Sequence, residues 1–346
     1  MTVTVDNHIF YDNVDNGRKR PVPEGAEGIP VKFCIAGEGA IAQKHLDGLA
    51  RIEGVEVVSI AGGNAADTEE VATKRGIPFW SLDLAEAMRQ PGVDAVILTT
   101  PTQLHATQAV AVMEAGKHVL IEIPMADSLA DTEAVVAAQE RTGVTAMVCH
   151  TRRFNPSHRF VHNRIVGGEL VLQHLVVETF FFRRENRNAL GKPRTWTDHL
   201  LWHHSCHTVD LFRYQTGEEP DIAWAQQGPA HPQLGIAMDM TIGLRAPKSG
   251  ALCSLALSFN NNGPLGTFFR YICDNGTYVA RYDDLVDGYE KPVDLSGVAM
   301  SSDGIELQDR EFIASIRESR EPNASVAQCL PTMQVVDRLA QSLSEK

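Results

Sequence analysis

The chain has 346 residues, of which 43% are hydrophobic and 22% are charged, and its formal net charge is −13. These proportions are typical of a folded protein rather than a disordered one, and the length favours two domains over one. A strongly acidic chain repels phosphate backbones, so nucleic acid is not an expected partner. A local basic pocket could still bind a small anion.

Membrane, secreted and zinc-ribbon proteins have signatures that this sequence lacks. No apolar run is long enough to span a bilayer, and residues 1–20 lack the basic-then-apolar order of a signal peptide. The six cysteines are scattered with no close pair, which argues against a disulfide framework and against a zinc ribbon. We therefore expect a cytoplasmic protein with no membrane partner.

The first half of the chain alternates strand and helix patterns. Residues 1–30 are polar and contain three prolines, so we predict an N-terminal arm. Over residues 31–150, apolar runs typical of buried strands alternate with helical patterns: strands at 31–37, 55–62, 94–100, 118–124 and 144–150, and helices at 40–52, 68–75, 105–116 and 128–143. This alternation predicts βαβ units and a domain built on a parallel sheet.

The pattern changes near residue 151, where we place a second domain, 151–346. It opens with a helix near 155–165, a strand at 170–182 and a helix at 199–217. Five β-rich runs follow without intervening helices, and helices near 306–320 and 326–343 close the chain. Strands joined only by turns pair antiparallel, so this domain is predicted to be α/β with a large, mostly antiparallel open sheet.

A glycine-rich loop lies between the first predicted strand and helix. Gly37-Glu38-Gly39-Ala40-Ile41-Ala42 matches G-x-G-x-x-A. Gly37 permits the tight turn, Gly39 lets the backbone approach a pyrophosphate, and Ala42 lets the helix pack closely on the strand. Such a motif alone is weak, but its position in a βαβ series predicts a dinucleotide-binding Rossmann domain.

The end of the second strand bears on the choice of dinucleotide. The carboxylate that usually binds the ribose 2′-hydroxyl is replaced by Ala61-Gly62-Gly63-Asn64. Without a carboxylate there, a 2′-phosphate is not repelled, so we expect NADP as the cofactor, with NAD also possible and Asn64 in contact with it. The alternative is a glycine-rich turn with no cofactor preference.

Several segments resemble the Gfo/Idh/MocA oxidoreductases. They are GEGAIAQKHLDGL, TTPTQLHATQAVAVMEAGKHVLIEIP, RRFNP, HTVDLF and EFIASIRESREPNASV, which lie between residues 31 and 335. The resemblance implies an NAD(P)-dependent dehydrogenase acting on a CH–OH group. It also implies a homodimer or homotetramer formed through the open sheet. It adds five residues to the cofactor site: Thr100, Pro101, His105, Glu122 and Pro124.

Two departures from the family pattern point to a subgroup. The usual Glu-Lys-Pro is Glu122-Ile123-Pro124, and His203 stands where the family has the aspartate of Asp-x-x-x-His. Both departures also occur in members that resemble this chain over longer strings such as TFFFRREN and SFNNNGPLGTFFRYICDNGT. The resemblance to them implies NADP-dependent oxidation of a cyclic hemiacetal dicarboxylate to a lactone, in protocatechuate 4,5-cleavage.

The predicted helix at 199–217 carries the candidate catalytic residues. His203 and His207 are four residues apart and share a helix face, with Asp210 placed to hold a ring nitrogen of His207. The resemblance assigns His207 as the base, with His203 replacing the missing aspartate and His204 near the substrate. Buried structural histidines are one alternative. Zinc is another, but His204 takes the position of the glutamate in H-E-x-x-H, so we expect no metal.

Basic residues flank this helix in an otherwise acidic chain. Arginine binds planar carboxylates through paired hydrogen bonds, so Arg153, Arg184 and Arg194 are predicted to hold an anionic substrate. Strand alternation lets only one of Arg183 and Arg184 face the cleft. Ordinary surface charge is the alternative for each arginine. For the protein as a whole, the alternative functions are a sugar or cyclitol dehydrogenase and a non-catalytic dinucleotide sensor.

Overall fold

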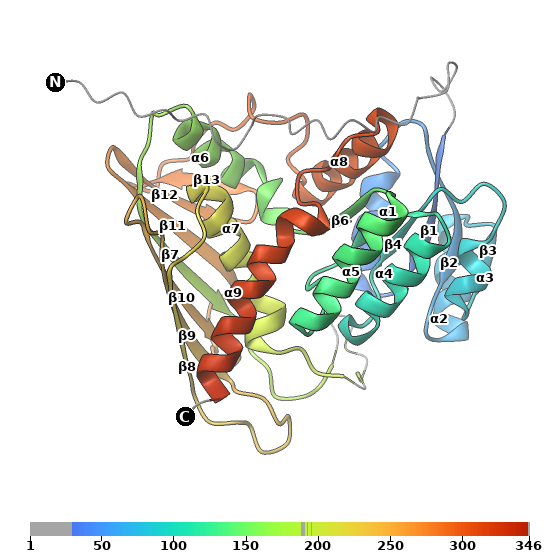
Figure 1. Ribbon diagram of the computed structural model, residues 1–346, viewed down its shortest axis with the longest axis horizontal. Helices are drawn as coiled ribbons and strands as arrows, with labels where there is room; N and C mark the ends of the chain where they lie inside the picture. Colours follow the sequence, from blue (N-terminus) through green and yellow to red (C-terminus); the bar gives the residue numbers. More distant parts are fainter. Residues whose placement is uncertain (1–29, 188–190, 192, 195, 345–346) are drawn as a thin grey trace.

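A computed structural model describes residues 30–344 except 188–190, 192 and 195. Two sheets organise the described residues, and they stand next to one another with helices between them and around the first sheet (Figure 1). The predicted arm, 1–30, lies outside the described residues except for Pro30. No helix in the described part of the chain is long and apolar enough to cross a membrane.

The first sheet has six parallel strands in the order β3-β2-β1-β4-β5-β6, which confirms the predicted Rossmann topology. Their bounds are β1 Val31–Ala36, β2 Val55–Ala61, β3 Phe79–Ser81, β4 Ala95–Leu98, β5 His118–Ile121 and β6 Ala146–Val148. Strand β3 was not predicted, because three residues are too short to show a periodicity. The carboxyl ends of β1, β2, β4 and β5 lie at one edge of this sheet.

Helices cover both faces of the parallel sheet. They are α1 Ala40–Leu49, α2 Ala65–Arg75, α3 Leu84–Met88, η1 Thr102–Leu104, α4 His105–Glu114 and α5 Leu129–Thr142. Local signals fix several ends: the side chain of Ser128 caps α5 at its start, and Gly143 ends it in the left-handed conformation at φ 66°. The short helix α3 was missed by the sequence analysis for the same reason as β3.

The second sheet has seven strands in the order β13-β12-β11-β7-β10-β9-β8. Their bounds are β7 Leu172–Phe180, β8 Ile222–Gln227, β9 Asp239–Arg245, β10 Leu252–Ser258, β11 Gly266–Cys273, β12 Gly276–Arg281 and β13 Asp284–Asp287. Only β7 and β10 pair parallel, and the other neighbours pair antiparallel, so the predicted sheet is confirmed.

Helices join the two sheets. They are η2 Thr151–Arg153, α6 Pro156–Val166, η3 Leu200–Ser205, α7 Cys206–Thr216, α8 Gly304–Glu318 and α9 Val326–Ser344. Although it follows the second sheet in sequence, α8 packs against the first, where the rings of Phe312 and Phe33 are 6.2 Å apart. Helix α9 begins in the first core at Val326 and reaches the second at Leu339. The C-terminal helix α9 therefore packs into the hydrophobic cores of both domains.

Candidate active site

The glycine loop has the backbone that a dinucleotide requires. Gly37 has φ 113°, and a Cβ placed there would lie 2.4 Å from Thr99 Oγ1, so only glycine fits. Gly39 precedes α1, and a Cβ there would meet nothing within 4 Å, which leaves open space in front of the helix N-terminus. Ala42 is buried against the sheet. Together, these features fit a pyrophosphate at the start of α1, beside Ala40 and Ile41.

The turn after β2 differs from the sequence-based expectation. The carboxylate of Glu38, from the glycine loop, accepts hydrogen bonds from the backbone N–H groups of Gly63 at 3.0 Å and Asn64 at 3.2 Å. The side chain of Asn64 caps α2 by accepting from the N–H of Asp67. The premise that no carboxylate lies at this turn is therefore wrong: one is present, supplied by the neighbouring loop.

The remaining predicted cofactor residues gather at the ends of β4 and β5. The ring of His105 bridges the carbonyl oxygens of Thr100 and Pro124, at 2.8 Å each. This bridge ties the segment containing Pro101 to the segment that follows β5. The carboxylate of Glu122 contacts His45 Nε2 at 3.1 Å, and its other oxygen accepts from the N–H of Ile123.

Beneath these residues, a buried ion pair joins the middle of α1 to α8. His45 of α1 contacts both oxygens of Asp309 of α8, at 2.9 and 3.0 Å. Although burial opposes the charge, Asp309 and Glu122 raise the pKa of His45 to about 10. His45, Glu122 and Cys149 are also close enough to share a metal ion, as are His150, Asp210 and Cys329. Neither group includes the predicted histidines of 203–207.

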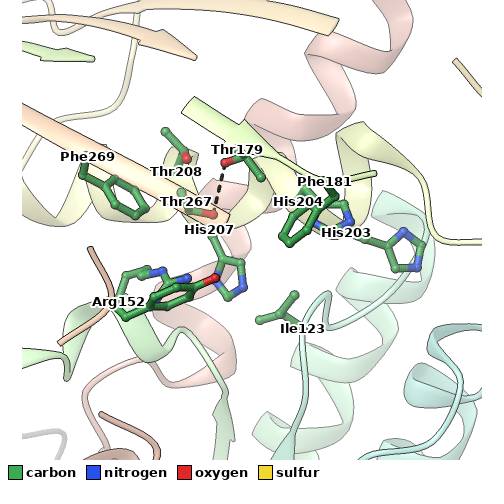
Figure 2. A pocket seen from close by; sticks show the side chains of 11 residues that line it. Ile123, Arg152, Thr179, Phe181, His203, His204, His207, Thr208, Thr267 and Phe269 are labelled. Atoms are coloured by element: carbon green, nitrogen blue, oxygen red, sulfur yellow. Dashed lines mark hydrogen bonds between the residues drawn. The ribbon is translucent and has the colours of Figure 1, made fainter. Parts of the chain in front are cut away.

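A pocket of about 210 Å³ lies between the two sheets (Figure 2). Its walls combine histidines, an arginine, hydroxyl groups and aromatic rings: Ile123, Arg152, Thr179, Phe181, His203, His204, His207, Thr208, Thr267, Phe269 and Tyr282. Ile123, which replaces the family's lysine, comes from the cofactor-binding side of the pocket. Such a mixture of apolar walls and a few converging polar groups is typical of a small-molecule site.

All three predicted histidines line this pocket, and an unusual helical turn places them there. Residues 200–205 form the π-helical turn η3, which passes directly into α7. π-Helical turns are rare and frequently mark functional sites. In Figure 2 the ring of His207 points into the pocket between Arg152 and Ile123. Burial and the charge of Arg152 hold the pKa of His207 well below its usual range, so the ring is neutral and is a weaker base than a free imidazole.

His203 and His204 have different surroundings from His207. His203 stacks on Trp196 with ring centroids 5.8 Å apart, and its Nδ1 accepts from the backbone N–H of His199. Burial lowers the pKa of His203 to about 3. His204 Nε2 lies 3.1 Å from Asp198 Oδ2. The structure therefore brings the three rings to one pocket. They differ in their hydrogen-bond partners.

The predicted pairing of Asp210 with His207 is not observed. Asp210 instead forms two hydrogen bonds with Arg153, at 2.8 and 2.6 Å, and accepts another from Thr332. Among the described residues, His207 Nδ1 has no hydrogen-bond partner. Arg153 and Asp210 are both buried, their opposite charges neutralise one another, and neither lines the pocket. The expectations for Asp210 as a catalytic residue and Arg153 as a substrate ligand are therefore corrected.

Arg184 and Arg194 also lie outside the pocket lining. Arg194 and Arg183 both pair with Asp198, which contacts His204 as well. Arg184 is exposed over the ring of Phe182 and donates to Asn260. Strand alternation had left open which of Arg183 and Arg184 faces the cleft. In the structure, neither of them lines the pocket.

The arginine that does line the pocket is Arg152, which the sequence analysis passed over for its neighbour. The short turn η2 points Arg153 into the protein and Arg152 at the pocket. The guanidinium of Arg152 lies over the rings of Phe269 and Tyr282, at 5.6 and 5.2 Å. Its side chain donates to Asn155, yet it forms no ion pair with any described carboxylate, and its Nε has no partner there. Asp198 and Tyr282 were missed as well, since no local motif marks them, and Glu38 was noted only as a variable position of the glycine motif.

Comparison with known proteins agrees with this geometry. Residues 31–150 match the oxidoreductase family with an NAD-binding Rossmann fold, and residues 156–299 match the bacterial oxidoreductase C-terminal family. The fold and the site define an NAD(P)-dependent dehydrogenase that acts on a CH–OH group, and the chain belongs to the Gfo/Idh/MocA oxidoreductase family.

Individual relatives narrow this class. The chain is 60% identical to 4-carboxy-2-hydroxymuconate-6-semialdehyde dehydrogenase of Sphingobium sp., over 91% of this chain and all of the relative. It is therefore a dehydrogenase of that kind. It is 29% identical to a Bacillus subtilis scyllo-inositol 2-dehydrogenase, over 55% of each chain. Levoglucosan dehydrogenase in complex with NADH and L-sorbose shares the fold, with a TM-score of 0.79 and 19% identity over 92% of this chain and 97% of that chain.

Proposed function

We propose that the protein oxidises the cyclic hemiacetal of 4-carboxy-2-hydroxymuconate-6-semialdehyde to 2-pyrone-4,6-dicarboxylate, with NADP, in protocatechuate 4,5-cleavage. The similarity to the Sphingobium dehydrogenase supports the substrate. The pocket supports the anionic character of this substrate, because its cation and its aromatic walls suit a planar anion.

Arg152 is the observation that carries this proposal. A partly buried cation with no ion pair in the described structure is costly, since the charge of Asp283 offsets only part of the cost of removing Arg152 from water. A substrate carboxylate would supply that counter-charge through paired hydrogen bonds. A neutral sugar or cyclitol would leave Arg152 unpaired, and for this reason the anionic substrate is favoured over the sugar alternative.

His207 is the proposed base. A bound nicotinamide dinucleotide would accept the hydride that leaves the hemiacetal carbon. The hemiacetal O–H bond then breaks, its electron pair forms the lactone carbonyl, and its proton passes to the neutral ring of His207. Arg152 is one of the charges that lower the pKa of His207. A carboxylate bound to Arg152 would neutralise that charge and so raise the proton affinity of the base as the substrate arrives.

Two finer features belong to the same proposal. Gly62 and Gly63 place no side chain of their own against a ribose 2′-phosphate, which supports NADP once the carboxylate of Glu38 has moved.

We also propose a homodimer or homotetramer formed through the outer face of the seven-stranded sheet. Ile222, Trp224 and Leu252 are exposed on its strands, and the ring of Trp224 occupies the space beside Gly243.

The deciding experiment gives the purified protein the hemiacetal dicarboxylate and NADP and follows reduced nicotinamide by absorbance. Parallel reactions use myo-inositol and levoglucosan. We expect turnover of the dicarboxylate alone, with 2-pyrone-4,6-dicarboxylate as the product. Rapid oxidation of the neutral substrates without the dicarboxylate would establish the sugar alternative. Bound NADP without turnover of any substrate would indicate a sensor.

A further inference from the structure

The middle residue of the glycine loop holds the turn at which a dinucleotide's adenosine ribose is recognised. Glu38 Oε2 lies 3.0 Å from Gly63 N, and Oε1 lies 3.2 Å from Asn64 N, although the segments are 25 residues apart. A Cβ on Gly62 would come within 2.9 Å of the same carboxylate. An anion of the chain itself therefore occupies the two amide groups at the start of α2.

This position matters because of the Rossmann geometry. The pyrophosphate lies at the start of α1, and the 2′-position of the adenosine ribose reaches the end of β2, where an acidic residue usually accepts from the hydroxyl. Here β2 ends in Ala61 and is followed by two glycines, so it supplies no acid of its own. Glu38 delivers the carboxylate from the adjacent loop instead.

We propose that Glu38 lowers the preference of this enzyme for NADP over NAD by competing with the 2′-phosphate of NADP. With NAD, the carboxylate stays on the turn and accepts from the ribose 2′-hydroxyl. With NADP, the phosphate takes the N–H groups of Gly63 and Asn64, and the Glu38 side chain rotates away. Two anions cannot share one pair of donors, so Glu38 weakens NADP binding without weakening NAD binding.

The surroundings make this exchange feasible. Glu38 is only partly buried, and its two hydrogen bonds to the turn are the side-chain contacts that hold it in the described structure. Arg75, at the opposite end of the helix that follows the turn, forms hydrogen bonds with Gln43 and Asp47. The turn therefore offers a phosphate backbone N–H groups at a helix N-terminus, the same donors that now bind the carboxylate.

The test measures binding rather than turnover, and it rests on the proposed use of NADP. Adenosine 2′,5′-bisphosphate and ADP are titrated by calorimetry into the wild-type protein, Glu38→Gln and Glu69→Gln. Glu69 is exposed on α2, so its substitution removes a negative charge without touching the turn. For Glu38→Gln we expect affinity for the bisphosphate to rise at least about tenfold relative to ADP, which corresponds to about 1.4 kcal/mol. Retained ADP binding shows that the variant is folded.

The outcomes separate the two proposals. An unchanged ratio of the two Kd values in Glu38→Gln, or an equal change in Glu69→Gln, overturns the role of Glu38 and leaves NADP use intact. If the wild type binds ADP and ignores the bisphosphate, the proposal of NADP fails. Gain of bisphosphate binding in Glu38→Gln would in that case still support the role of Glu38.

Discussion

Arg153 and Asp210 form a two-fold hydrogen-bonded ion pair that links the end of the parallel sheet to helix α7. Nε–Oδ2 is 2.8 Å, Nη2–Oδ1 is 2.6 Å, and the side chains are 5% and 0% exposed. The remaining guanidinium nitrogen, Nη1 of Arg153, donates to Asn323, which precedes α9, and to Gln328 within α9. The pair therefore holds three segments of the chain together just behind the pocket.

Removing one member of this pair should destabilise the fold. Asp210→Ala leaves a buried, unpaired guanidinium, and we expect the free energy of unfolding to fall by about 3–5 kcal/mol. Urea denaturation followed by circular dichroism measures the loss. The double variant Asp210→Ala/Arg153→Met should lose less than the sum of the single variants, because no charge is left unpaired. A loss below about 0.5 kcal/mol in Asp210→Ala is what a substitution on the surface causes, and it would contradict a stabilising role for this ion pair.

Arg152→Met should weaken substrate binding selectively. Loss of a charge-assisted contact to a carboxylate predicts a kcat/KM for the dicarboxylate roughly 10- to 100-fold lower, mostly through KM, with NADP affinity unchanged. Steady-state kinetics and cofactor titration provide the two readouts. Arg184→Met is the matched control, since Arg184 lies on the surface over Phe182. If Arg184→Met raised KM and Arg152→Met did not, the pocket would be wrongly assigned.

His207→Ala should impair the chemical step and spare cofactor binding. Loss of a general base typically lowers the rate about 10²- to 10⁴-fold. The site of the dinucleotide pyrophosphate lies at the start of α1, on another element, so the Kd for NADP should stay within error. Single-turnover reduction of the cofactor isolates the step. Near-normal turnover of this variant, together with a slow His204→Ala variant, would transfer the role to the ring that contacts Asp198.

The buried histidines predict loss of stability in mild acid. Burial lowers the pKa of His150 to about 4 and of His162 to about 4, from 6.5. Between these values the unfolded chain binds protons that the folded chain does not, so stability is lost as the pH falls from about 6.5 toward 4, by up to about 1.4 kcal/mol per pH unit for each histidine. His45, with a pKa raised to about 10, loses its contribution only as the pH rises above 6.5, so it offsets nothing in this interval.

Urea midpoints at pH 7 and pH 5 test this dependence. His162 stacks on Tyr214 with centroids 3.8 Å apart, so His162→Phe keeps an aromatic ring there and removes the titrating group. We expect the variant to lose less stability than the wild type between the two pH values. Equal losses in both proteins would show that His162 does not contribute to the acid sensitivity.

The sequence determines most of the fold through patterns that one can read locally. Alternation of apolar runs and helices predicted the parallel sheet, and strands without intervening helices predicted the antiparallel one. The failures involve elements too short for periodicity, such as β3 Phe79–Ser81 and β13 Asp284–Asp287. The packing of α8 on the first sheet was also invisible, because Phe312 and Phe33 are distant in sequence.

The site was predicted less completely, since its chemistry depends on direction as well as residue type. The motif located Gly37 and Gly39 because their role is a backbone property. Arg152 and Arg153 are chemically equal in the sequence, and only the turn η2 decides that one faces the pocket and the other Asp210. A carboxylate was sought on β2, whereas Glu38 reaches the same turn from another loop.

The turn at Leu200–Ser205 makes the pocket sensitive to insertion and deletion as well as to substitution. A π-helical turn bonds residue i to i+5, so it holds one residue more than the α-helical turn it replaces. Deleting that residue would let the segment return to α-helix, in which each position advances by about 100°. His203 would then turn relative to His207, although α7 and its core contacts could remain. Length variation at this one turn is therefore a simple way for such an enzyme to present a different wall to its substrate during evolution or redesign.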